Sequence, residues 1–103
     1  MVVALERESM RTIYRLYTER RPNLAELTAR YFDGFTLIDA VGYWQGNAES
    51  SAIIEVISTS FDYTRVCALA HDIRETNGQQ SVYLVRIACE LFEVTADTTR
   101  EVV

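Results

Sequence analysis

The chain has 103 residues, of which 49% are apolar and 24% charged, and its formal net charge is −5. This length suits one domain, and the balance of apolar and charged residues is that of a globular protein rather than a disordered one. No apolar run approaches the ~20 residues that a membrane-spanning helix needs. The negative charge argues against binding to nucleic-acid phosphates. We therefore expect neither a membrane nor a nucleic acid among its partners.

The N-terminus and the cysteines predict a cytoplasmic location. Glu6 and Glu8 interrupt the opening segment where a signal peptide would continue its apolar stretch. Cys67 and Cys89 are the only cysteines, and both lie within apolar-periodic segments. Two cysteines cannot form a disulfide framework, which fits a reducing compartment.

The basic residues are all arginine, and they are unevenly distributed. Residues 1–30 hold six of the ten arginines together with four carboxylates, whereas residues 31–103 hold four arginines and eleven carboxylates. Guanidinium groups suit the recognition of phosphate and carboxylate groups. The all-arginine usage is explained most simply by codon bias, but if the chain binds an anionic ligand, we expect it near the first predicted strand.

The first half of the chain predicts a strand, a helix and a second strand. Residues 11–19 are rich in β-branched and aromatic side chains and predict a strand. Asn23 and Glu26 then have the spacing of a capping box, which predicts a helix over residues 24–32. Residues 35–44 predict the second strand, which ends at the turn formed by residues 45–47.

The second half repeats this pattern in the order strand, helix, strand. Residues 51–58 predict the third strand, and an apolar stripe at helical spacing predicts a helix over residues 63–76. Residues 81–94 predict a long fourth strand. Residues 1–10 and 95–103 show weak patterning and are expected to be a loose extension and a loose tail around a single domain of residues 11–94.

The order βαββαβ predicts an α+β fold of the ferredoxin-like type. Right-handed crossovers would place a four-stranded antiparallel sheet under two helices, both on one face. The other face is also apolar, since Ile53 and Ile57 oppose Ile54 and Val56 on the third strand. A large exposed apolar surface marks an interface, so we expect the chain to form a homo-oligomer through the open face of the sheet. The second half of the long last strand could also pair with the edge of a neighbouring subunit.

These features resemble the PII-like signalling proteins and the CutA proteins, which are ferredoxin-like trimers. In PII-like proteins a glycine- and aromatic-rich element joins strands two and three, and nucleotide binds beside it between subunits. The run from Val41 to Gly46, followed by Glu49, is similar in kind and position. The chain departs from the PII pattern in lacking a long loop here and in lacking lysine. Residues 31–36 and 42–46 also resemble small uncharacterised phage and bacterial proteins.

The resemblance implies a non-enzymatic, trimeric protein that senses or sequesters a nucleotide or nucleotide-like anion in its intersubunit clefts. Its backbone cradle would be formed by Gly42, Gln45 and Gly46, and its stacking surface by Tyr43 or Trp44. Arg11, Arg15 and Arg86 would supply positive charge. The same residues allow a second hypothesis, in which the protein is a structural or interaction module without a small-molecule ligand. Tyr43 and Trp44 would then be interface anchors, Arg86 would pair with a carboxylate of a neighbouring subunit, and Arg11 and Arg15 would be surface charges.

Three further features bear on site chemistry. Gly42 lies within a predicted strand, where glycine indicates a bulge or a close backbone approach. Cys67 and His71 have the i, i+4 spacing of a metal-binding pair, but two ligands do not complete a site, and a structural role is the simpler interpretation. Asp39 and Glu55 could pair as carboxylates or meet arginines across strands. No cofactor or metal is therefore assigned.

Overall fold

The computed structural model describes residues 10–96 and 99–101. It confirms the α+β class, with a four-stranded antiparallel sheet and two α-helices, and adds a short 3₁₀ turn and a second, two-stranded sheet. The elements are β1 (Met10–Glu19), α2 (Leu24–Ala29), β2 (Thr36–Trp44), β3 (Asn47–Ser58), η1 (Ser60–Asp62), α3 (Tyr63–Thr76), β4 (Tyr83–Glu90), β5 (Phe92–Val94) and β6 (Thr99–Glu101). Within this described part, no helix has the length and hydropathy needed to cross a bilayer.

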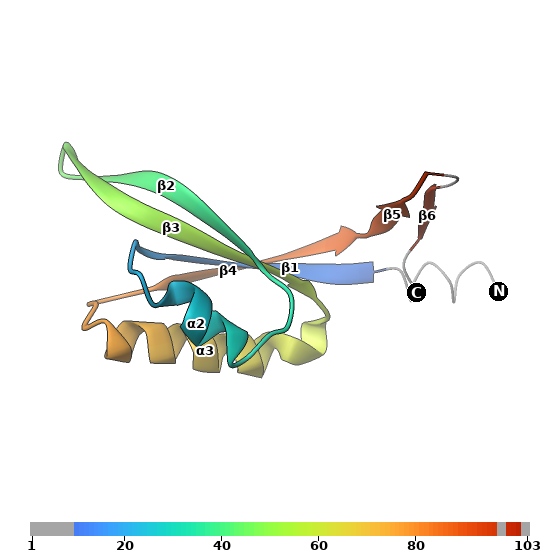
Figure 1. The fold of residues 1–103 in the computed structure, drawn as a ribbon, viewed down its shortest axis with the longest axis horizontal. Coiled ribbons are helices and arrows are strands. Elements are labelled where there is room, and N and C mark those ends of the chain that lie inside the picture. The colour runs from blue at the N-terminus through green and yellow to red at the C-terminus, as the bar shows by residue number, and fades with distance from the viewer. Residues whose placement is uncertain (1–9, 97–98, 102–103) are drawn as a thin grey trace.

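The main sheet has the strand order β2-β3-β1-β4, and each neighbouring pair is antiparallel. Both helices cover the same face of this sheet, and none of the described helices or strands covers the opposite face (Figure 1). The β2–β3 hairpin extends beyond the helices at one end of the molecule, and β5 and β6 lie at the other end (Figure 1).

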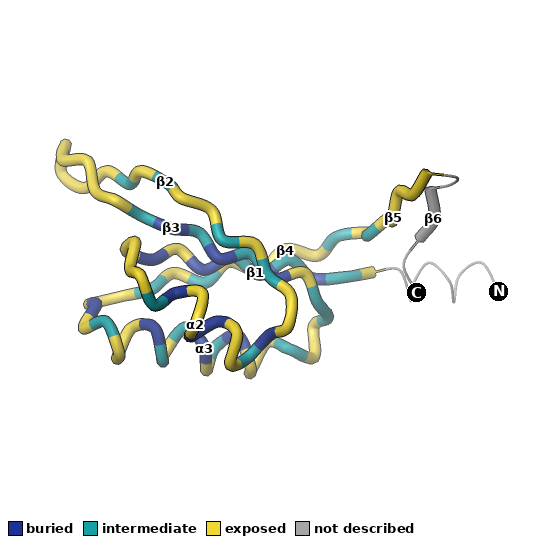
Figure 2. Tube along the Cα trace, viewed as in Figure 1, coloured by how far each residue is buried: buried dark blue, intermediate teal, exposed yellow. Residues whose placement is uncertain are grey.

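Alternating residues of the two central strands form the core. Tyr14 and Leu16 of β1 and Ile54 of β3 are at most 1% exposed. They pack with Leu27 of α2 and Leu69 of α3, so the core lies between the helices and the covered face of the sheet. Figure 2 shows the buried segments in the middle of the molecule and the exposed hairpin beyond it.

The first helix is shorter than its sequence pattern predicts, and its predicted capping box does not form. The helix ends at Ala29, and the Asn23 side chain caps no backbone amide. The Asn23 amide donates instead to Oδ1 of Asn77 (2.8 Å), while the Glu26 carboxylate accepts from Arg30 (3.3 Å). The Asn23 side chain is therefore turned toward the end of α3, and its Oδ1 atom, the acceptor that a cap would need, has no hydrogen-bond partner in the described structure.

The β2–β3 connection is tighter than predicted. Gln45 and Gly46 have φ angles of 49° and 80°, and Trp44 pairs with Asn47, which together define a two-residue turn of type I′. The third strand therefore begins at Asn47 rather than at residue 51. The predicted bulge at Gly42 is wrong, because the register continues through Gly42 opposite Glu49 without an extra residue.

The long fourth strand predicted over residues 81–94 is divided in two. It leaves the main sheet after Glu90, and Phe92–Val94 pair with Thr99–Glu101 of the same chain. β6 was not predicted, because it lies within the weakly patterned segment that was expected to be a loose tail. Residues 1–9 of the expected loose extension lie outside the described residues, whereas Met10 already pairs with Glu90.

Candidate functional site

A groove of about 760 Å³ lies beside the β2–β3 hairpin, where the main sheet extends past the helices. Three of the predicted ligand residues line it: Gly42, Tyr43 and Trp44. Gln45 and Gly46 form the turn at the tip of the hairpin and do not line the groove. Its other lining residues come from the two hairpin strands, the end of β1 and the segment that leads into β4: Ala40, Val41, Glu49, Ser51, Ala52, Ile53, Tyr17, Thr18, Glu19, Gln79, Gln80, Ser81 and Tyr83.

Small side chains separate two aromatic regions of the groove. Residues paired across antiparallel strands project to the same face, and on the open face Tyr17 pairs with Tyr83. Gly42 and Trp44 share that face nearer the hairpin tip. A Cβ atom built on Gly42 would lie 2.7 Å from Oγ of Ser51. The Ser51 hydroxyl therefore occupies the position that a Gly42 side chain would take, and these two small residues form a low sheet surface between Trp44 and the two tyrosines.

One wall of the groove is anchored by a buried amide. Gln79 is 5% exposed, and its Oε1 accepts hydrogen bonds from Oγ1 of Thr18 (2.9 Å) and from the backbone amide of Glu19 (3.1 Å). Arg74 donates to the Gln79 carbonyl oxygen (3.3 Å). These bonds fix the segment between α3 and β4 against the end of β1. Sequence reasoning did not assign a ligand role to Tyr17, Glu49 or Tyr83, because their proximity depends on the strand register.

None of the three predicted arginines lines this groove, although Arg15 interacts with Tyr17, which does. Arg11 and Arg15 project from the open face of β1, with Arg11 opposite Cys89 near the far end of the sheet. Nε of Arg15 lies 2.9 Å from Oε2 of Glu55, and this hydrogen bond raises the pKa of Arg15. Arg86 lies on the covered side of β4, with its guanidinium 4.6 Å from the centroid of the Tyr63 ring. The structure therefore does not gather the eight predicted ligand residues into one site.

Three further arginines of the basic N-terminal region that the structure describes are paired with carboxylates. Arg20 contacts Asp39 (2.7 Å), Arg21 contacts Glu19 (2.6 Å) and Arg30 contacts Glu26 (3.3 Å). Asp39 and Glu55 therefore meet arginines across the sheet rather than each other, as one of the two interpretations predicted. The local surplus of positive charge is largely neutralised within the chain.

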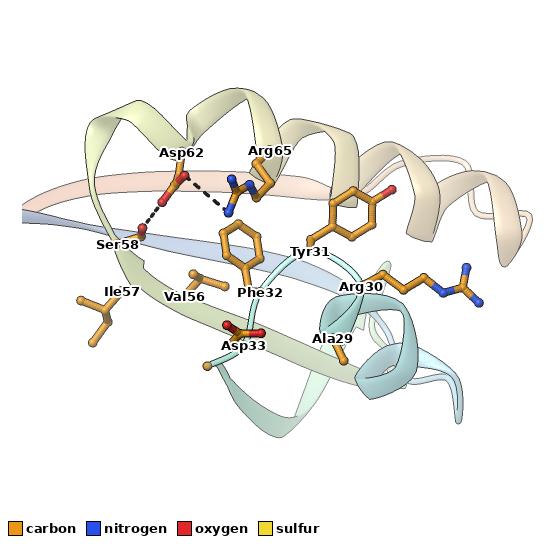
Figure 3. Close-up of a pocket in the computed structure, with 11 residues that line it drawn as sticks. Ala29, Arg30, Tyr31, Phe32, Asp33, Val56, Ile57, Ser58, Asp62 and Arg65 are labelled. Atoms are coloured by element: carbon orange, nitrogen blue, oxygen red, sulfur yellow. Dashed lines mark hydrogen bonds and ion pairs between the residues drawn. The ribbon is translucent and has the colours of Figure 1, made fainter.

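A second, smaller cavity of about 440 Å³ lies between the α2–β2 connection, the end of β3 and the start of α3 (Figure 3). Asp62 accepts a hydrogen bond from Ser58 and lies 3.9 Å from Arg65. The Arg65 guanidinium also lies 5.7 Å from the centroid of Phe32. Figure 3 shows Arg30 extending away from this cluster. Asp62 and Arg65 therefore pair with each other, and none of the predicted ligand residues lines the cavity.

The predicted metal pair stays incomplete in the described part of the chain. Cys67 is half-buried and His71 exposed on α3, and no three His, Cys, Asp or Glu side chains come together as metal ligands among the described residues. A hydrogen bond with the Cys67 thiol raises the pKa of Tyr63.

Comparison with known proteins leaves the geometry as the main guide to function. No protein-family model and no curated protein matches this chain. The chemistry of the groove is that of aromatic contact combined with carboxylates and amides, with no arginine or histidine among its lining residues.

Proposed function

We propose that this protein is a non-enzymatic, homo-oligomeric binding module of the ferredoxin-like fold. The fold assignment is supported by the strand order β2-β3-β1-β4 and by the two helices on one face. A cytoplasmic setting is supported by Cys67 and Cys89, which are both free thiols.

The open face of the sheet carries the proposal, because it is apolar and uncovered. Apart from Tyr17, Trp44, Ile53 and Tyr83, which line the groove, the register places five large apolar side chains on it: Ile13, Ile38, Ile57, Val85 and Ile87. Four strands spaced ~4.8 Å apart, with ~3.3 Å per residue along a ten-residue strand, present a face of roughly 600 Å². This is close to the ~800 Å² that each partner contributes to a stable interface. A second copy of the chain, with the same apolar face, is the occupant that fits.

An ion pair in the middle of this face makes it suitable for a specific partner. Arg15 and Glu55 lie on adjacent strands within the apolar surface and are already bonded to each other. Burying a preformed ion pair costs less desolvation free energy than burying a lone charge. In a self-association, each copy would also present both signs of charge to its neighbour. The resemblance to PII-like and CutA proteins implies that three copies close the assembly.

Binding of a nucleotide-like anion has less support as the function of the assembly. Arg15 is bonded to Glu55, and no arginine lines the groove that contains Gly42, Tyr43 and Trp44. Self-association is therefore the function that the geometry favours.

Sedimentation velocity over a range of concentrations tests the proposal. The wild-type protein is expected to sediment as a multiple of 11.8 kDa at micromolar concentration. Ile87→Lys adds a charge to the open face at a position that is 39% exposed in the protomer, so it should leave a folded monomer.

Phe61→Lys is the matched control, because Phe61 is 92% exposed and lies in η1, outside the sheet. This variant should keep the wild-type assembly. A wild-type monomer, or equal dissociation of the two variants, would contradict association through the sheet face.

A further inference from the structure

We propose that the groove beside the β2–β3 hairpin binds a small organic cation, with a quaternary or methylated ammonium group as the part that it recognises. This proposal concerns the hairpin end of the sheet and does not require the chain to self-associate.

Exposed aromatic rings provide the first part of the argument. Trp44 is 66% exposed and Tyr83 is 69% exposed, although both line the groove. Tyr17, which pairs with Tyr83, is 37% exposed. The faces of such rings carry negative partial charge and attract cations, most strongly at tryptophan. Rings at both ends of the groove are therefore available to a ligand.

The charge of the lining residues indicates the sign of the charge on the ligand. Glu19 and Glu49 line the groove, and no arginine or histidine does. The Glu19 carboxylate is shared with Arg21, whereas Glu49 makes no ion pair within the described part of the chain. A carboxylate beside exposed aromatic rings favours a cation and repels a phosphate.

The floor of the groove supplies the space. Ala40, Gly42 and Ser51 are the small residues of the open face between Trp44 and Tyr17. The volume of about 760 Å³ lies within the range of small-molecule sites. Hydrogen bonds of Gln79 to β1 hold one wall in place without a ligand. A compact ammonium group can therefore lie over the floor beside Gly42, within reach of the Trp44 ring and of the Glu49 carboxylate, which the register places opposite Gly42.

Trp44 is the only tryptophan of the chain, so its fluorescence reports directly on the groove. The probes are choline and 3,3-dimethyl-1-butanol, which has the same shape without the positive charge. Choline is expected to change the Trp44 emission saturably, with at least ten-fold tighter binding than the neutral alcohol. Equal binding of the two probes would show an apolar groove only, and no response to choline would also overturn the proposal. Tighter binding of adenosine monophosphate than of choline would show that the ligand is an anion.

Two substitutions in the groove and one control outside it test where choline binds, and all three keep Trp44 as the fluorescent reporter. Glu49→Gln should weaken choline binding about five-fold, as expected for the loss of one exposed charge pair. The control Glu75→Gln removes an exposed carboxylate on α3, outside the groove, and should leave binding unchanged. Gly42→Leu should abolish binding by filling the floor.

Circular dichroism and sedimentation of each variant separate this proposal from the one above. Loss of choline binding with an unchanged assembly supports the groove. An unchanged choline affinity in a folded Gly42→Leu protein would overturn it, whatever the oligomeric state.

Discussion

Tyr14 is the largest fully buried side chain in the described part of the protein, and its hydroxyl makes a hydrogen bond to the backbone. The hydroxyl donates to the Thr59 carbonyl oxygen (2.7 Å), which ties β1 to the segment after β3. Tyr14→Phe keeps the ring but leaves that carbonyl unpaired. We expect a loss of about 1 kcal/mol in the free energy of unfolding, measured by urea denaturation at pH 7. A loss below about 0.3 kcal/mol would mean that water replaces the bond.

The same residue predicts a loss of stability at alkaline pH. Burial raises the pKa of Tyr14 above its usual value of 10, and Asp62 adds to this, while Arg86 opposes it. A folded-state pKa above the unfolded value stabilises the fold below pH 10, and this contribution is lost as pH rises through the folded pKa. Tyr14→Phe should therefore flatten the decline of stability above pH 10. The decline should not vanish, because burial also raises the pKa of Tyr31. An identical alkaline slope in the two proteins would contradict this account.

At the scale of elements, the β2–β3 hairpin depends on a turn that its sequence does not fully favour. Gln45 adopts a φ of 49°, which asparagine and glycine tolerate better than glutamine does. Gln45→Asn creates the Asn-Gly pair preferred in type I′ turns. We expect slower amide exchange in β2 and β3, equivalent to about 0.5 kcal/mol of hairpin stability. The global unfolding midpoint should change little, because the hairpin tip lies beyond the buried core. A faster exchange would show that the glutamine side chain stabilises the turn.

Elements whose signals are local could be predicted from the sequence, whereas those that depend on distant partners could not. The β-branched and aromatic residues of 11–19 predicted β1, but they did not show that Tyr14 and Leu16 would be buried. The capping box at Asn23 did not form, because the Asn23 side chain is turned toward Asn77, 54 residues away. The end of β4 was missed because Phe92–Val94 find their own partner in β6. At the hairpin, the sequence identified Tyr43 and Trp44, but the pairing of Tyr17 with Tyr83 needed the register.

At the scale of the whole molecule, the two faces of the sheet differ in what covers them. One face lies under both helices, and the other lies open with the Arg15–Glu55 ion pair among apolar side chains. The sequence predicted that both faces of the sheet are apolar and that helices cover only one of them. It did not predict that Arg15 and Glu55 would bond to each other on the open face. Substitutions of the Arg15–Glu55 ion pair therefore test whether the open face is removed from water in the assembly.

Removing one partner of the ion pair should weaken self-association more than it weakens folding. Glu55→Gln leaves the Arg15 guanidinium charged and without its carboxylate, and burying a lone charge between two copies is costly. We expect the association constant, measured by sedimentation equilibrium, to fall at least ten-fold, with a small change in the unfolding midpoint. Asp39→Asn breaks the comparable contact with Arg20, which lies beyond the end of β1 and away from the open face, and should leave association unchanged.

Replacing both residues of the ion pair should restore the self-association that Glu55→Gln weakens. In Arg15→Met/Glu55→Met no charge remains to be desolvated, and methionine adds apolar contact of similar length. Replacing a buried ion pair with apolar residues is often neutral or stabilising, so the double variant should associate at least as tightly as the wild type. A double variant as weak as Glu55→Gln would show that the pair itself holds the copies together across the interface. If neither variant changes association, the open face is not the contact surface. The assembly would then have to use another surface, such as the edges of β2 and β4, which have no further strand beside them in the main sheet.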